Sequence, residues 1–369
     1  MYSNYRLLVL VSDAYGGHGG ISRFNRDFLA GLASDPKSKE IVVFPRLVKN
    51  PILENIPKKI KFYQNGNTSK PGYIKNLISF LVKDHNFDIL ICGHINLLSI
   101  AWPLARIFKL PICLIIHGID AWEPTKNRFA NYFSKRTDFV VSVSKVSLDR
   151  FQGWSGFNQK KTWILPNCVD LSKFRPQPKD PKLIERYGLN NKKVIMTLGR
   201  IPGWDRHKGF DEVIDILPHL LREDPNLVYL IAGDGPDKNR LFRKALSLGI
   251  GKHVVFTGMV LEAEKVAHYC LADVYAMPSR GEGFGIVLLE AMACGVPVIA
   301  SKFDGGKEAL RNGKLGQLVD PANPEQLASA IKQALEIPHG VPRGLEYFSK
   351  NNFEHRVQKL VTEIIEYNV

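Results

Sequence analysis

The stretch Ser-Arg-Gly-Glu-Gly-Phe-Gly-Ile-Val-Leu-Leu-Glu-Ala-Met-Ala-Cys-Gly, residues 279–295, decides the fold of this chain. It follows the apolar run Val274–Met277, which predicts a buried strand, and it opens an apolar helix at Ile286. Three glycines in its first seven residues let a ligand approach the backbone closely. The first N–H groups of a helix have no partner and carry partial positive charge, which suits a phosphate. The stretch therefore predicts a phosphate-binding loop between a strand and its helix.

Two glutamates flank this loop: Glu282 lies within it, and Glu290 lies about two turns into the helix. Acidic groups beside a phosphate site cannot bind the phosphate itself, because like charges repel. They suit the hydroxyl groups of a sugar or of a ribose. Taken alone, the same pattern also fits a capped helix with two surface glutamates.

The rest of the chain repeats this alternation of short apolar runs and amphipathic stretches, which predicts parallel sheets covered on both faces. Pro166–Pro181 is polar, holds four prolines and reads as a linker. We therefore expect an α/β protein with two doubly wound domains, residues 1–170 and 171–349, and a final helix at about 350–369. The predicted strands are Leu7–Val11, Ile41–Phe44, Ile89–Cys92, Ile112–Ile116, Phe139–Val143, Val194–Leu198, Val228–Ala232, Val254–Phe256, Val274–Met277 and Val296–Ala300.

Nearly all unusual polar and glycine residues follow these strands. Ligands of open parallel sheets bind outside the carboxyl ends of the strands, so two such domains facing each other would form a binding cleft. In the second domain, Arg200 and Lys208 follow one strand and supply two positive charges for a diphosphate. The chain contains no Asp-x-Asp, the usual carboxylate cradle for a divalent metal. Alternatively, Arg200 and Lys208 are surface cations that contact solvent and bind no ligand.

Three further loops are weaker candidates. Gly16–Gly20 precedes a helix and offers backbone N–H groups, although it also fits a tight turn. His117 follows a buried strand and is a hydrogen-bonding or proton-handling candidate, or a structural histidine. Gly233–Asp237 has the composition of a turn, and its role as part of a binding site is the weaker hypothesis.

Composition limits the function classes. The chain has 369 residues, 45% hydrophobic residues and a net charge of +14. Residues 1–170 hold 23 Lys and Arg against 12 Asp and Glu, so the first half carries most of the excess. A basic surface attracts anionic partners such as phospholipid, or it is an ordinary solvated surface. Five cysteines without metal-ligand spacing indicate a reducing compartment. No signal peptide or membrane span is evident, so we expect a cytoplasmic protein with at most peripheral membrane contact.

In order and spacing, these motifs resemble the family-4 retaining glycosyltransferases, which have the GT-B fold of two Rossmann-like domains. The similarity covers most of the chain and is strongest from Met196 to Asp320. The pair Glu282 and Glu290 matches the E-x7-E signature of that family. The chain departs from the family in the longer spacing between Arg200 and Lys208, and in Cys168, where many members have glycine. The other matching motifs are Gly199-Arg200, Lys208-Gly209, Ala232–Pro236, Phe256–Gly258, Pro278-Ser279, Ala291–Val298, Gly305-Gly306 and Glu308.

The resemblance implies a role for each matching residue. Glu290 would bind the ribose, and Glu282 the donor sugar. Arg200 and Lys208 would hold the diphosphate, and His117 would sit beside the donor sugar near the reacting carbon. The remaining donor-binding candidates are Gly19, Gly20, Gly233, Val260, Gly283, Phe284, Gly285 and Ile286. The first domain would lie on the acceptor side, and the final helix would cross back onto it.

The function expected from this resemblance is transfer of a hexose from a nucleoside diphosphate sugar, with retention and without a metal or other cofactor. UDP-glucose is the favoured donor and GDP-mannose the next. The basic first domain favours a lipid-linked saccharide acceptor at the inner membrane face, as in exopolysaccharide assembly. The alternative enzyme is a sugar-nucleotide 2-epimerase of the same fold. A nucleic-acid-binding protein is disfavoured because no recognised motif is present, and a dehydrogenase because neither half has the full dinucleotide fingerprint.

Overall fold

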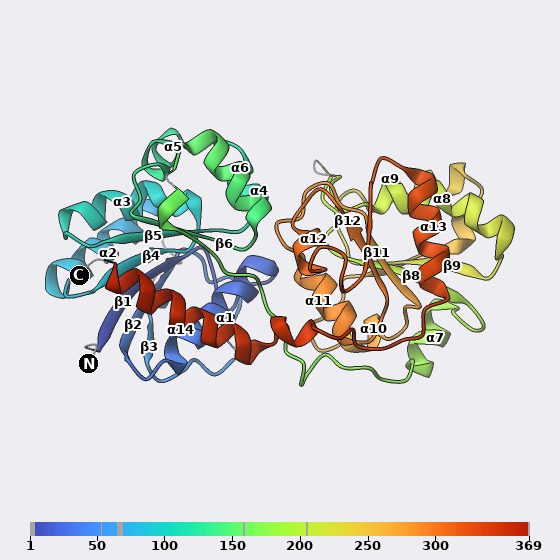
Figure 1. The fold of residues 1–369 in the computed structure, drawn as a ribbon, viewed down its shortest axis with the longest axis horizontal. Helices are drawn as coiled ribbons and strands as arrows, with labels where there is room; N and C mark the ends of the chain where they lie inside the picture. Colours follow the sequence, from blue (N-terminus) through green and yellow to red (C-terminus); the bar gives the residue numbers. More distant parts are fainter. Residues whose placement is uncertain (1–3, 53, 65–68, 158, 204–205, 368–369) are drawn as a thin grey trace. The chain divides into compact units, whose positions relative to one another are not determined.

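The computed structural model describes residues 4–52, 54–64, 69–157, 159–203 and 206–367. The chain divides into two compact units, one formed by Met1–Cys168 with Lys350–Val369 and the other by Val169–Ser349. It passes from the first unit to the second inside the proline-rich segment. Each unit holds a parallel sheet with helices on both faces, so the predicted α/β class is confirmed (Figure 1).

The first unit contains a seven-stranded sheet in the order β3-β2-β1-β4-β5-β6-β7. All its neighbouring strands are parallel, and β1 lies between β2 and β4, with Leu7 opposite both Ile41 and Ile89. The strands are β1 Tyr5–Val11, β2 Ser38–Pro45, β3 Ile60–Phe62, β4 Ile89–Cys92, β5 Ile112–Ile116, β6 Phe139–Ser142 and β7 Thr162–Ile164. The helices are α1 Gly20–Ser34, α2 Lys70–Lys83, η2 Ile95–Leu97, α3 Leu98–Ile107, α4 Ile119–Trp122, α5 Arg128–Ser134, α6 Lys145–Ser155, η3 Gln159–Lys161 and α14 Lys350–Glu366.

The two faces of this sheet carry different helices. Alternate residues of a strand point to opposite faces, and Leu8 and Leu10 of β1 join a core with α2, α3 and α6. On the other face, α1 and α14 lie side by side (Figure 1). Leu97–Ile116, the longest apolar region of the chain, contains the end of η2, then α3 and β5. No helix in the described ranges is long and apolar enough to cross a membrane.

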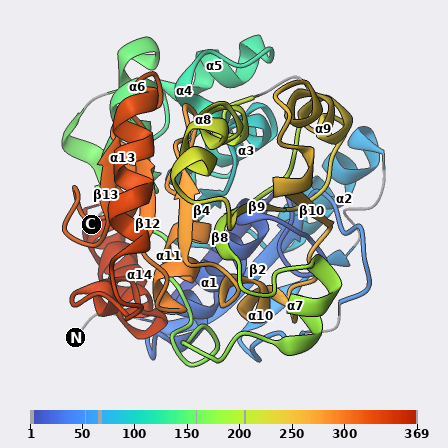
Figure 2. The same cartoon turned by 90° about the vertical axis from the view of Figure 1, so that its right-hand side faces the viewer.

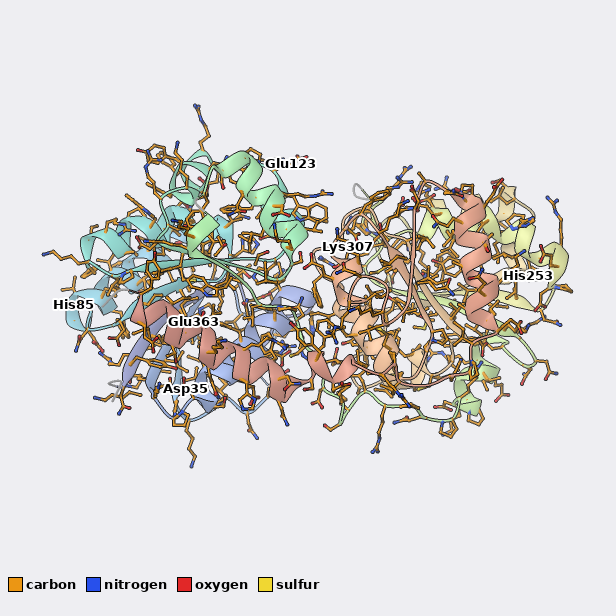
Figure 3. The ribbon with its side chains drawn as sticks, viewed as in Figure 1. Asp35, His85, Glu123, His253, Lys307 and Glu363 are labelled. Atoms are coloured by element: carbon orange, nitrogen blue, oxygen red, sulfur yellow. The ribbon has the colours of Figure 1, made fainter. Side chains whose placement is uncertain are left out.

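Helix α14 belongs to the first unit although it ends the chain. Its buried residues recur at helical spacing, which gives it one apolar face. Phe353 meets Phe24 of α1 edge-on, with 5.9 Å between ring centroids. Gly31 of α1 allows this close approach, because a Cβ there would lie 3.0 Å from the Cβ of Val357. Glu363, labelled in Figure 3, accepts a hydrogen bond from the Trp163 indole at 2.8 Å.

The second unit contains a six-stranded parallel sheet in the order β10-β9-β8-β11-β12-β13. Its core packs α8, α9 and α13 on one face, while α7 packs on the other (Figure 2). The strands are β8 Lys193–Leu198, β9 Leu227–Ala232, β10 Val254–Gly258, β11 Val274–Met277, β12 Val298–Ser301 and β13 Gln317–Val319. The helices are α7 Pro181–Tyr187, α8 Phe210–Glu223, α9 Lys238–Ser247, η4 Gly251–His253, α10 Lys265–Tyr269, α11 Ile286–Ala293, α12 Gly306–Ala309, α13 Pro324–Leu335 and η5 Leu345–Phe348.

The ten predicted strands are confirmed with small shifts at their ends. The sequence did not predict β3, β7 and β13, which are three residues long and lie at or next to sheet edges. Such strands bury little apolar surface, so their sequences carry no long apolar run. In both sheets the strand order reverses once, between β1 and β4 and between β8 and β11. Ligands bind at such a reversal, outside the carboxyl ends of the strands.

Replacing Phe353 with alanine tests the packing of α14. Phe353 is fully buried, so the substitution should lower the free energy of unfolding by roughly 3–5 kcal/mol. Urea denaturation measures this loss. Lys359→Ala on the exposed side of α14 is the control and should change stability by less than about 0.5 kcal/mol. An equal effect of the two variants would contradict the packing described here.

Candidate functional site

The strand reversal of the second unit brings the two main predicted loops together. β8 pairs directly with β11, so the loops that follow these strands are neighbours. The Arg280 N–H donates to the carbonyl of His207 at 2.7 Å, which joins the loops backbone to backbone. Gly209 has a φ of 82°, and a Cβ there would lie 2.7 Å from the carbonyl oxygen of Pro278. Only glycine fits this junction, which places Lys208 beside Glu282.

Lys208 and Glu282 form an ion pair between these loops, and both side chains are about four-fifths buried. A lysine ammonium has three N–H donors, so the pair leaves donors for another oxygen. The carboxylate likewise keeps acceptor positions. The pair is therefore a fixed element that can present a cation and an acceptor to one ligand.

Asp304, in the loop after β12, holds the Glu282 loop in place. Its carboxylate accepts the Ser279 hydroxyl at 2.6 Å and the N–H groups of Glu282 and Gly306 at 2.9 and 3.0 Å. Burial raises the pKa of Asp304 to about 6, although these hydrogen bonds favour the charged form. Sequence analysis missed this residue. Its position directly before Gly305-Gly306, a motif already noted, was the only indication of it.

Glu290 lies on α11, and its side chain is buried, with 1% of the residue exposed. Its Oε2 atom accepts the Tyr269 hydroxyl at 2.8 Å, and the Lys265 ammonium lies 3.4 Å from both carboxylate oxygens. Lys265 also pairs with Glu262 at 2.9 Å. Burial opposes the charge on Lys265, but Glu290 and Glu262 outweigh it and raise the lysine pKa. The interpretation of Glu290 as a surface glutamate is therefore wrong.

The first turn of α11 begins at a glycine, and its Leu288 N–H donates to the Gly285 carbonyl at 3.0 Å. Its N-cap is Gly285 with a φ of 93°, and no described side chain caps it. The same is true of α8, which begins after Gly209. In contrast, Asp180 and Asn323 cap α7 and α13 with their side chains. The helix at residues 279–295 therefore begins at a glycine cap, and the binding role of Gly283–Ile286 stays a prediction.

The remaining predicted residues of this unit lie along the same sheet edge. Arg200 follows β8 and is exposed, and none of the described residues forms an ion pair with it. Gly233 follows β9 and packs against Gly199, where a Cβ would lie 1.9 Å from a carbonyl oxygen. Val260 follows β10 and is half-buried. Trp204 and Asp205, inside the Arg200–Lys208 loop, lie outside the described residues. In Figure 3, Lys307 marks this carboxyl edge of the unit and His253 the opposite edge.

In the first unit, Gly19 and Gly20 begin α1 directly after the glycine loop. Gly19 has a φ of 98° and caps α1 with no described side chain accepting from the helix. A Cβ at Gly19 would meet nothing within 4 Å, so this backbone is open to a ligand. Asp13 stabilises the loop by accepting the Ser22 hydroxyl at 2.5 Å and, through its carbonyl, the Asn25 amide at 2.7 Å.

His117 follows β5 and is half-buried against Phe24. Its Nε2 lies 2.9 Å from the carbonyl oxygen of Gly93, so Nε2 carries the proton and Nδ1 is left as an acceptor. Burial lowers the pKa of His117 to about 3, so the ring is neutral near pH 7. A neutral ring bonded to a backbone carbonyl fits hydrogen bonding or a structural histidine better than proton transfer, and the role of His117 toward a ligand stays a prediction. Asp120, which sequence analysis did not select, accepts the His117 backbone N–H at 3.3 Å, and burial raises its pKa to about 7.

The structure thus gathers the predicted residues into two sets, one on each unit. Arg200, Lys208, Gly233, Val260, Glu282, Gly283, Phe284, Gly285, Ile286 and Glu290 share the carboxyl edge of the second sheet. Gly19, Gly20 and His117 share the carboxyl edge of the first. Within each unit, the missed residues Asp304, Tyr269, Lys265, Asp13 and Asp120 support the predicted ones.

Two family models match the chain. Residues 179–355 match the model described as glycosyl transferases group 1, and residues 18–173 match glycosyltransferase family 4. One relative, from Mycolicibacterium smegmatis, is a GDP-mannose-dependent alpha-(1-6)-phosphatidylinositol monomannoside mannosyltransferase. It is 34% identical over 270 residues, which is 70% of each chain. A protein of the same description from Mycobacterium tuberculosis is 29% identical over 89% of each chain.

Solved structures show a similar fold. The Anabaena protein HepE, solved with UDP-glucose, aligns with a TM-score of 0.76 at 21% identity, over 97% of this chain and 100% of its own. The lipopolysaccharide outer core galactosyltransferase WaaB aligns with a TM-score of 0.73 at 18% identity, over 97% and 99%. At these identities the comparison concerns the fold alone.

Replacing Asp304 with alanine tests its role in the loop. The variant leaves the N–H groups of Glu282 and Gly306 without their acceptor, at a cost of roughly 1–3 kcal/mol for each buried donor. Urea denaturation should show the loss, and hydrogen exchange should show faster exchange of these two amides. Asp320→Ala is the control, because Asp320 accepts one backbone N–H, from Ala322, and pairs with Lys302 in an exposed position. Unchanged amide exchange in Asp304→Ala would rule out the bracing role.

Proposed function

The chain belongs to the family-4 glycosyltransferases and has the GT-B fold, and from this premise we propose that it transfers mannose from GDP-mannose to a lipid-linked saccharide. Family membership makes it a hexosyltransferase that uses a nucleotide-sugar donor. The observation that carries the residue assignments is the fixed Lys208–Glu282 pair beside the glycine-capped N-terminus of α11. The donor, the acceptor and the role of each residue are the proposal.

The diphosphate of the donor is assigned to three features of the second unit. The first N–H groups of α11 supply donors with the positive end of the helix dipole. Arg200 adds an exposed guanidinium, which suits bidentate contact with phosphate oxygens. Lys208 adds an ammonium that its pairing with Glu282 holds in place. The two cations and the backbone donors would together offset the charge of a departing diphosphate without a metal ion.

The two glutamates are assigned to hydroxyl groups. Glu290 is buried, and Tyr269 and Lys265 fix its orientation, so its carboxylate can accept from the two ribose hydroxyls. Glu282 is closer to the loop surface and would accept from the hexose. Val260, which follows β10, is assigned to contact with the nucleotide base. Its contact would be made by backbone groups, which give little discrimination between bases.

The first unit is assigned two parts in the reaction. Gly19 and Gly20 would offer backbone N–H groups to the diphosphate. His117 would accept a hydrogen bond from the donor sugar through Nδ1, because Nε2–H is already bound to Gly93. A neutral imidazole keeps this acceptor available throughout the physiological pH range.

The proposed reaction retains the configuration at the anomeric carbon. The bond from that carbon to the β-phosphate oxygen breaks, and the acceptor oxygen bonds to the same face. The acceptor proton passes to the leaving phosphate oxygen, so no protein base is required. Catalysis would then rest on positioning and on stabilising the departing diphosphate.

The donor assignment follows the relatives more than the initial expectation. The expectation from the resemblance was UDP-glucose, with GDP-mannose second. The relatives that match at 34% and 29% identity are described as GDP-mannose-dependent, whereas the protein solved with UDP-glucose shares only the fold at 21%. The same relatives act on phosphatidylinositol mannosides, which supports a glycolipid acceptor for this chain. The basic first half also supports an acceptor at an anionic membrane surface.

A thermal-shift panel of GDP, GDP-mannose, UDP and UDP-glucose tests the donor. A ligand at a hundred times its Kd stabilises the folded protein by about 2.7 kcal/mol, so the true donor should raise Tm clearly. We expect the guanine pair to give the larger shift. A larger shift with the uracil pair would restore UDP-glucose, and no shift with any of the four would contradict the donor site.

Replacing Arg200 with alanine tests the diphosphate assignment. Loss of one donor to the developing charge should lower kcat roughly a hundredfold or more. Stability should change by less than about 0.5 kcal/mol, because the side chain is exposed. Arg222→Ala is the control, since Arg222 lies at the far end of α8 from the site and should leave kcat unchanged. Near-normal turnover in Arg200→Ala would refute its assigned role.

A further inference from the structure

Two cysteines of the second unit lie beside each other at the ends of neighbouring helices. Cys270 directly follows α10 and Cys294 directly follows α11, and these two helices are in contact (Figure 1). Both residues are buried with free thiols, and their side chains are joined by a hydrogen bond. Strand β11 and helix α11 separate them in the sequence, so the fold brings them together. We call Cys270 and Cys294 the dithiol pair.

The hydrogen bond within the dithiol pair makes the two thiols unequal. It lowers the pKa of Cys270 below the usual range, because the Cys294 thiol can donate to the Cys270 sulfur when that sulfur is ionised. The same hydrogen bond, together with burial, raises the pKa of Cys294. Cys270 is therefore the readier thiolate, and Cys294 is held next to it as a thiol. A low-pKa cysteine beside a second thiol is the usual arrangement of an oxidisable pair.

The other three cysteines have a different environment. Cys92 lies on β4 and Cys113 on β5, where burial raises the pKa of Cys92 to about 12 and raises that of Cys113 as well. Burial also raises the pKa of Cys168. All five cysteines belong to the described residues, and only Cys270 has a lowered pKa. The chain thus provides internal controls for the reactivity of the dithiol pair.

Only an exposed segment without helix or strand covers the dithiol pair. Residues 175–178 of this segment are all exposed. The Arg175 carbonyl oxygen lies 3.9 Å from the Cys270 sulfur. A Cβ at Gly295, the residue after Cys294, would lie 3.1 Å from the Pro176 side chain. A small oxidant would therefore reach the sulfurs after a local displacement of this segment, without opening of the sheet.

The dithiol pair is attached to the groups that orient Glu290. Tyr269, the residue before Cys270, donates its hydroxyl to the Glu290 carboxylate at 2.8 Å. The Cys294 N–H donates to the Glu290 backbone carbonyl at 3.1 Å. The sulfurs of a disulfide are about 2 Å apart, closer than two hydrogen-bonded sulfurs can be. Disulfide formation would draw the ends of α10 and α11 together and displace Tyr269 from Glu290, since α10 has only five residues.

We propose that Cys270 and Cys294 form a peroxide-oxidisable dithiol whose disulfide weakens binding of the nucleotide donor. The Cys270 thiolate attacks one oxygen of hydrogen peroxide, the O–O bond breaks, and a sulfenic acid and hydroxide form. The Cys294 thiol then attacks the Cys270 sulfur, the S–S bond forms, and water leaves. The hydroxide takes up the proton that Cys270 had lost. Two thiols and one peroxide thus give one disulfide and two waters, and the two sulfurs supply the two electrons that peroxide gains.

The two parts of this inference have different foundations. The effect on donor binding rests on the proposed function, in which Glu290 binds the ribose. Formation of the disulfide rests only on the contact between the two thiols and on their cover. A reducing compartment, which the sequence predicts, would keep the pair as two thiols until peroxide is present.

Counting thiols after peroxide treatment tests formation of the disulfide. The folded, reduced protein is treated with hydrogen peroxide, then denatured and labelled with a maleimide. We expect the number of labelled cysteines to fall from five to three, and dithiothreitol to restore all five. Peptide mapping by mass spectrometry should place the bond between Cys270 and Cys294. An unchanged thiol count, or a bond that involves Cys92, Cys113 or Cys168, would overturn the proposal.

Three alanine variants identify the attacking sulfur. Cys270→Ala and Cys294→Ala each remove one member of the pair, and Cys113→Ala is the matched control because it removes a buried sulfur in the first unit. Only Cys113→Ala should still form the disulfide. In Cys294→Ala the sulfenic acid has no thiol to react with, so dimedone should label Cys270, whereas Cys270→Ala should take up little dimedone. Equal labelling of the two pair variants would contradict the assignment of Cys270 as the attacking thiolate.

Titration with GDP, and with UDP in parallel, measures the effect on the donor site. Oxidation of the wild type should raise the Kd of the preferred nucleotide roughly tenfold or more, since a hydrogen bond to a charged group is disturbed, and dithiothreitol should reverse the change. Peroxide-treated Cys270→Ala should keep the Kd of its reduced form. An unchanged Kd after complete disulfide formation would overturn the effect on the donor. Failure of the reduced protein to bind either nucleotide would count against the proposed function, while the thiol count would still decide whether the disulfide forms.

Discussion

Backbone-to-backbone contact at the carboxyl edge of the second sheet is the constraint on which the site depends. The strand order reverses between β8 and β11, so the loops after these strands must pack against each other. A Cβ would collide with a carbonyl oxygen at Gly209, Gly233 and Gly305. The absence of side chains at these points lets the loops approach closely, and α11 begins beside them at a glycine without a side-chain cap.

Electrostatic compensation then makes this compact edge stable before a ligand arrives. Lys208 pairs with Glu282, and Lys265 lies between Glu290 and Glu262. Unpaired charges in such half-buried positions would be costly, and pairing removes much of that cost while keeping each group in place. Asp304 extends the arrangement by holding the Glu282 backbone. A nucleotide sugar would meet groups already oriented, which reduces the entropy lost on binding.

The first unit depends on the helix that ends the chain. Helices α1 and α14 lie side by side on one face of its sheet. Gly31 allows their close approach, because a Cβ there would lie 3.0 Å from the Cβ of Val357. The sheet of the first unit is therefore covered on this face only when the last segment of the chain packs against α1.

The sequence by itself determined the fold class, the ten main strands and the loop at residues 279–295, because buried parallel strands and glycine turns leave local patterns. It also singled out Glu282, Arg200 and His117, which follow strands, and Glu290, which lies at a characteristic spacing from Glu282. Only the tertiary structure decided that Glu290 is buried, that Lys208 pairs with Glu282, and that Asp304 braces the loop. These facts arise from contacts between segments distant along the chain, such as Ser279 with Asp304. Local sequence patterns do not reveal such contacts. The short edge strands were not predicted for a related reason, because pairing with a neighbouring strand forms them and their composition does not.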